Sequence, residues 1–171
     1  MATEAWLRGP LEGVDPYLMP AAHTLVQVKE EIEGAATGLS TDQLWVRPGG
    51  AASVGFHLRH LAGSTDRLLT YARGEQLRPE QMASLAAEGE PGEPPEDVAA
   101  LLAGALAALE RALDVIRATP RDALLEAREV GRARLPSTVM GLLFHVAAHA
   151  QRHAGQVVTT AKIVRGMELG G

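Results

Sequence analysis

Four long segments of the chain repeat apolar residues at intervals of three and four, the spacing of an α-helix with one buried face. The first begins near Asp15 and Pro16, because aspartate is a good N-cap and proline suits the first helical position, although Pro20 can delay or kink this start. Ser53 can cap the second segment. The pattern therefore predicts helices over approximately residues 15–34, 53–74, 97–118 and 136–166.

The stretches between these segments are predicted to be loops. Residues 88–97 form an acidic connector, and its prolines and glycines cannot continue a helix. Residues 121–135 are ambiguous, since 123–127 fits a short helix and 128–134 fits an irregular or extended segment. Residues 41–50 read as a loop, and no convincing strand is found. Four amphipathic helices of about 20 residues without strands predict an all-α fold, specifically a four-helix bundle.

Length and composition are those of a globular protein. The 171 residues suit a single domain, residues 1–171, with 46% hydrophobic and 22% charged residues. A net charge of −5 and only two Trp, two Tyr and two Phe argue against nucleic acid as a partner. No apolar stretch is long enough to span a membrane, and the N-terminus has no basic region followed by an apolar one. We therefore expect no membrane partner and a cytoplasmic location.

The absence of cysteine limits the chemistry of the chain. It excludes disulfides, Cys-ligated zinc and an enzyme thiol as nucleophile. Thiol chemistry in this protein would have to use a thiol that a substrate brings.

Histidines supply the strongest chemical signal. His145, His149 and His153 follow one another at intervals of four in the last segment, and His57 and His60 lie in the second. Residues four apart are neighbours on a helix surface, and this set lies on the apolar stripe. Burying several neutral imidazoles is costly unless their nitrogens find partners, and a divalent ion satisfies two or three at once. The pattern favours a metal site over hydrogen-bonded core or surface histidines.

Two familiar kinds of hydrolase do not fit. A zincin protease needs a glutamate directly after the first histidine of His-x-x-x-His, where this chain has Ala150. A serine hydrolase of the α/β type needs a Gly-x-Ser-x-Gly turn, which the sequence lacks. A third metal ligand must come from outside the last segment, and the second segment offers two candidates. Helical geometry slightly favours His57 over His60 but does not settle the choice.

Two segments, Ser53–Ser64 and His145–Gln156, resemble the hallmark segments of the DinB-like (YfiT-type) superfamily, and the likeness in helix order extends over nearly the whole chain. The resemblance implies a four-helix bundle, frequently a homodimer, with a three-histidine site for a divalent transition metal such as zinc or nickel. The family pattern assigns the ligands to His60, which precedes Leu-Ala, and to His149 and His153.

The remaining polar residues near these motifs have less defined roles. Under the family pattern, His57, His145 and Gln156 are packing or pocket residues beside the ligands. Two further residues, Arg59 and Arg152, border the ligands, as does Gln151, and all three could orient an anionic cosubstrate.

Three classes of function follow. A metal with three histidine ligands keeps an open position, which is typical of catalytic sites, and it lowers the pKa of a bound water or thiol. The resemblance favours a metal-dependent S-transferase that activates a low-molecular-weight thiol of the bacillithiol or mycothiol type, with a small molecule as substrate. A metal-dependent hydrolase at the same site and a non-enzymatic, stress-related binding bundle are the alternatives. The catalytic residues are not assigned.

Overall fold

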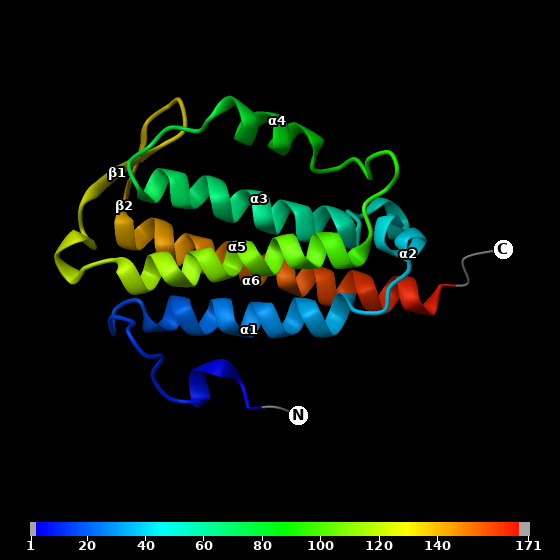
Figure 1. The fold of residues 1–171 in the computed structure, drawn as a ribbon, viewed down its shortest axis with the longest axis horizontal. Coiled ribbons are helices and arrows are strands. Elements are labelled where there is room, and N and C mark those ends of the chain that lie inside the picture. Colours follow the sequence, from blue (N-terminus) through cyan, green and yellow to red (C-terminus); the bar gives the residue numbers. More distant parts are fainter. Residues whose placement is uncertain (1–2, 168–171) are drawn as a thin grey trace.

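The computed structural model describes residues 3–167, of which 66% are helical, so the prediction of a mainly helical fold is confirmed. Four long helices lie side by side and form the body of the molecule (Figure 1). These are α1 (Met19–Ala36), α3 (Val54–Ala72), α5 (Val98–Ala118) and α6 (Val139–Gly166). All four overlap the residue ranges that the apolar periodicity predicts.

The apolar faces of the long helices form one core. Helix α6 packs against both α1 and α3, while α5 packs against α3 and α1. Leu58 and Leu61 of α3 and Val146 of α6 are almost completely buried. Each such side chain contributes roughly 1.5–3 kcal/mol when it leaves water. This burial fixes the rotation of α3 and α6, and thereby the direction in which their polar side chains point.

The start of α1 differs from the prediction. The helix begins at Met19, with Leu18 as its N-cap and Pro20 in its first turn, rather than at Asp15 and Pro16. The Asp15 side chain instead accepts a hydrogen bond of 2.9 Å from the Tyr17 N–H, so it stabilises a turn ahead of the helix. Pro20 delays the start, as the sequence indicated.

Two short helices lie between the long ones, one of them in residues 41–50, which were predicted to be a loop. Helix α2 (Thr41–Trp45) is closed by a capping box in which Ser40 and Gln43 bond to each other's backbone N–H groups. Helix α4 (Pro79–Ala87) runs across the outside of α3 (Figure 1). Both are too short to show clear helical periodicity.

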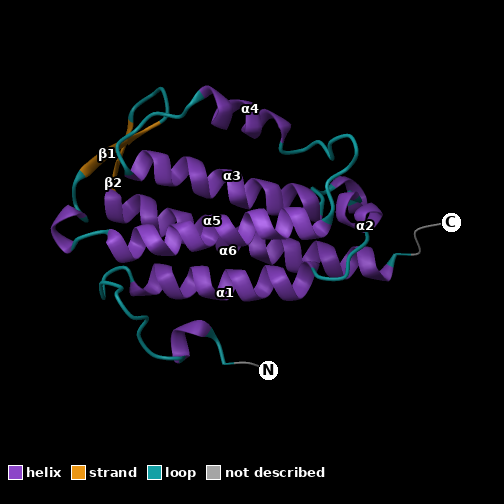
Figure 2. Ribbon diagram, in the orientation of Figure 1, coloured by secondary structure: helices purple, strands orange, loops and turns teal. Residues whose placement is uncertain are grey.

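A β-hairpin contradicts the expectation of no strands. Strand β1 (Ala127–Val130) pairs antiparallel with β2 (Leu135–Thr138) in the ambiguous region, at the end of the molecule where α3 ends (Figure 2). The strands are only four residues long and half exposed, so their sequence carries no strong alternation. Helix α6 begins directly after β2, with Thr138 as its N-cap, and not at Pro136 and Ser137.

The helices were compared with the length and apolar character of a membrane span. None of those within residues 3–167 combines the length and the apolar character needed to cross a bilayer.

The cap of α3 gives a direct test of the fold. Ser53 is 3% exposed, and its hydroxyl accepts a hydrogen bond of 3.1 Å from the Phe56 N–H. Ser53→Ala removes this acceptor, so we expect urea denaturation to show a free energy of unfolding that is lower by about 1 kcal/mol. Ser53→Thr keeps the hydroxyl and serves as the control. Equal losses in both variants would mean that packing, and not the cap, is what Ser53 contributes.

Candidate metal centre

Helices α3 and α6 run in opposite directions beside each other and bring three histidines together (Figure 1). His60 of α3 faces His149 and His153 of α6, and one ring nitrogen from each lies within 4.8 Å of the others. The Nε2 atoms of His60 and His149 are 3.0 Å apart. All three side chains are partly buried. The structure thus juxtaposes the three residues that the family pattern selects, and they could hold a metal ion.

The other two histidines of the motifs lie beside this group. His57 is 6% exposed, and its Nδ1 is 3.0 Å from Nδ1 of His153, so it contacts the back of that ring. His145 is exposed, with its ring centroid 5.7 Å from that of His149. Gln156 is exposed on the last turns of α6. The structure therefore places His57 against His153 and His60 against His149, both at 3.0 Å between ring nitrogens.

A buried carboxylate orients His60. Glu88, the C-cap residue of α4, is 2% exposed, and its Oε2 lies 2.6 Å from His60 Nδ1. Its Oε1 accepts a hydrogen bond of 2.7 Å from the Arg67 guanidinium. An ionised carboxylate only accepts, so in the neutral imidazole of His60 the proton sits on Nδ1. The lone pair of Nε2 then points toward His149, which is the orientation a metal ligand needs.

Sequence reasoning missed Glu88. The residue begins the acidic connector and is one of several glutamates there, and α4 itself shows no clear periodicity. Burial raises the pKa of Glu88, but hydrogen bonds from His60 and Arg67 outweigh this and lower the pKa overall. The carboxylate is therefore ionised at neutral pH. No local signal in the sequence distinguishes it from its exposed neighbours.

Two histidines of α6, His149 and His153, are held in their neutral form. Burial, together with the positive charge that His60 can carry, lowers the pKa of His149 to about 4 and that of His153 to about 3. Burial likewise lowers the pKa of His57 to about 4. Neutral imidazole is the form that binds metal, so protons compete weakly for His149 and His153 near neutral pH.

The donor set fits a divalent transition metal. Two ring nitrogens 3.0 Å apart need a proton or a cation between them, because two lone pairs at that distance repel each other. Three imidazoles suit zinc and nickel, and they leave at least one coordination position for another ligand.

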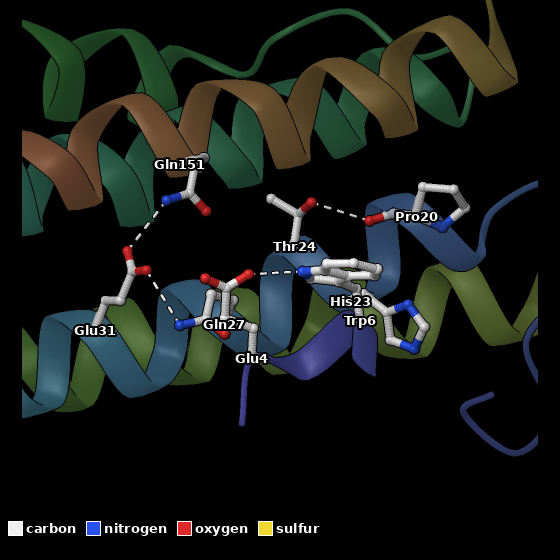
Figure 3. A pocket seen from close by; sticks show the side chains of 8 residues that line it. All are labelled: Glu4, Trp6, Pro20, His23, Thr24, Gln27, Glu31 and Gln151. Carbon is white, nitrogen blue, oxygen red and sulfur yellow. Dashed lines mark hydrogen bonds between the residues drawn. The ribbon is translucent and has the colours of Figure 1, made fainter. Parts of the chain in front are cut away.

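Two of the three polar residues that border the motifs, Arg59 and Gln151, have hydrogen-bond partners away from this group. Arg59 stacks on Trp45 at 4.8 Å and donates to the carbonyls of Ala87 and Pro91, so it anchors the connector. Arg152 is exposed. Gln151 points toward α1, where its amide donates to Glu31 (Figure 3).

A pocket of about 400 Å³ lies between the N-terminal segment, α1 and the face of α6 that carries Gln151 (Figure 3). Its one histidine, His23, has Nε2 2.9 Å from the Gly9 carbonyl oxygen. Gln151 lies half a helical turn away from the midpoint between His149 and His153, so this pocket is separate from the histidine group. Within residues 3–167 it brings no second histidine into reach and offers no comparable metal site.

Two adjacent helices that bring three histidines together define a helical protein with a candidate metal site. The family model of the DinB superfamily matches residues 24–157, from α1 through most of α6, and the chain belongs to this superfamily. The matched range includes all three grouped histidines. No curated protein matches the chain.

The role of Glu88 can be tested by Glu88→Gln. In this variant, the amide oxygen of the glutamine can accept from Arg67, and its NH₂ group then donates to His60 Nδ1. This favours the tautomer of His60 that carries its proton on Nε2. We expect zinc affinity, measured by competition with a chelating dye, to fall about 10- to 100-fold. Glu90→Gln, two residues further along in an exposed position, is the matched control. Unchanged affinity in Glu88→Gln would show that the carboxylate does not position His60.

Gly63 offers an independent test of the same contact. A Cβ at this position would overlap Glu88 Oε1 and come within 2.8 Å of the Arg67 guanidinium. Gly63→Ala should therefore displace the carboxylate and weaken zinc binding, even though alanine favours the helix. Gly104→Ala in α5, where nothing lies within 4 Å of the added carbon, should leave zinc affinity unchanged and raise the free energy of unfolding by about 0.5–1 kcal/mol. Equal zinc affinities in the two variants would contradict the assignment.

Proposed function

We propose that His60, His149 and His153 bind one divalent transition-metal ion, zinc or nickel, and that the protein is a metal-dependent transferase acting with a low-molecular-weight thiol. The observation that carries the proposal is the convergence of three imidazole nitrogens, one of them oriented by the buried carboxylate of Glu88. Membership in the DinB superfamily supports metal binding.

The residues of the chain have separable tasks in this proposal. A metal held by three neutral ligands supplies Lewis acidity that lowers the pKa of a thiol or a water molecule. Glu88 keeps the proton of His60 on Nδ1, and Arg67 balances the charge of Glu88. Apolar packing around the core-facing side of His149 and His153 holds both rings neutral. These groups place and tune the ligands, and no side chain is assigned a role as acid or base.

Transfer is preferred to hydrolysis because the chain resembles enzymes that use external thiols of the bacillithiol or mycothiol type. Because the chain has no cysteine, the thiol must come from a substrate. In such a transfer the thiol loses its proton, sulfur forms a bond to an electrophilic carbon, and the leaving group departs with its bonding electrons. A hydrolase with the same ligands would turn over without thiol. A non-enzymatic binding bundle would carry little metal and retain its partner after His149→Ala.

Several wider features belong to the same proposal. We propose that residues 1–171 are a single domain built as a four-helix bundle of the DinB type, that it forms a homodimer, and that it works in the cytoplasm. Its substrate is a small molecule, and it binds neither nucleic acid nor membranes. The net charge of −5 supports the exclusion of nucleic acid.

Elemental analysis of the protein without a histidine tag tests the ligands. We expect near one equivalent of a transition metal, and loss of most of it in His60→Ala, His149→Ala and His153→Ala, because each removes one of three donors. His57→Ala is the control and should keep most of the metal, since His57 lies outside the group. Loss in His57→Ala with retention in His60→Ala would reverse the assignment in α3. Little metal even after reconstitution would favour the binding bundle.

A further inference from the structure

A pocket of about 320 Å³ opens directly at the grouped histidines, and the function proposed above does not account for it. His60 and His149 form one end of this pocket, together with His145 and Ser64. From there it follows one face of α3, on which His60, Ser64, Leu68 and Tyr71 succeed one another at intervals of three and four. Its size is at the lower end of the range for small-molecule sites.

The end of the pocket away from the histidines is apolar. Leu68 and Tyr71 of α3 and Leu77, from the segment before α4, line this end. Leu85 of α4 also lines the pocket but lies nearer the histidines, one turn before Glu88. Leu85 is 40% exposed although it is a large apolar side chain. His60 and Tyr71 are eleven positions apart in α3, so their backbones are about 16 Å apart along the helix axis. The pocket is therefore elongated, with imidazoles at one end and hydrocarbon at the other.

The charges around the pocket favour a ligand with an uncharged body and a metal-binding donor atom at one end. None of the described residues that line it is acidic, and its one guanidinium, that of Arg67, donates to the buried carboxylate of Glu88. A carboxylate or an ammonium group at the apolar end would lose water without finding an opposite charge. A donor atom at the histidine end would instead lie beside the ligating nitrogens.

We infer that this pocket selects the substrate: it binds the elongated, uncharged, apolar body of a small molecule whose reactive end lies beside His60 and His149. The inference rests on the proposed metal site for the position of the reactive end. It narrows the substrate class to molecules with a hydrocarbon chain or ring attached to the reacting group.

Straight-chain alkyl hydroxamates, from acetohydroxamate to octanohydroxamate, test the inference because their heads bind metals and their tails vary only in length. With zinc-loaded protein, calorimetry should show affinity rising by up to about fourfold for each added methylene until the pocket is filled. A hydroxamate of octanoate length whose tail ends in a carboxylate should bind no better than acetohydroxamate. Affinity that does not depend on chain length would overturn the inference.

A pair of variants locates the effect. Leu85→Glu places a charge in the wall of the pocket and should abolish the dependence of hydroxamate affinity on chain length. Met82→Glu is the matched control, because Met82 lies on the same helix with a similar exposure, 43%, and does not line the pocket. Equal chain-length dependence in both variants would place the tail elsewhere and overturn the inference.

Failure of the metal site gives a different result from failure of the pocket. If the protein retains no zinc, the proposed function fails, and 1-alkanols of increasing length then replace the hydroxamates. Shifts of the Leu77 and Leu85 methyl signals in NMR spectra that grow with chain length would support the pocket as a site for an apolar body. Unchanged methyl signals would overturn it.

Discussion

The packing of α3 against α6 is the constraint on which the rest of the structure depends. The two helices share a buried apolar face that includes Leu58, Leu61 and Val146, and this burial fixes how each helix is rotated about its axis. Once the rotation is fixed, His60 must face His149 and His153. The histidines sit at the edge of the core, where their burial is costly, and the apolar contacts on either side offset that cost.

A polar layer outside α3 completes the arrangement. Within α4 only Gln81 is buried, and Glu88 follows seven residues later on the same face. Gln81 donates to Asp66 and Thr70, while Glu88 accepts from Arg67 and contacts His60. Helix α4 is therefore held to α3 by hydrogen bonds and charge rather than by an apolar stripe. Gly63 permits this, because a larger residue there would displace the carboxylate.

The sequence predicts the long helices well, and it does so for a physical reason. Eighteen or more residues of regular apolar spacing, as in α5, leave little room for another interpretation, whereas the nine residues of α4 and the four-residue strands give too few repeats. The predicted start of α1 was wrong because an aspartate such as Asp15 can cap a turn as well as a helix.

The candidate site was predictable only in part. The spacing of His149 and His153 follows from one helix, but the choice of His60 over His57 depends on how α3 rotates against its neighbours, which local periodicity does not determine. The resemblance to the DinB pattern supplied that choice. Glu88 lies 28 residues from His60 across a connector, and such a contact is decided by tertiary structure alone.

Helix α4 contributes to both the histidine group and the pocket that opens from it. Its last turn supplies the carboxylate that orients His60, and Leu85, one turn earlier, forms part of the pocket wall. Anything that binds better when α4 is docked therefore shifts α4 toward the docked state. By thermodynamic reciprocity, an ion at the histidines and a molecule in the pocket would each raise the affinity for the other by the same factor. A single short helix, held mainly by polar contacts, would thus make the two binding events cooperative.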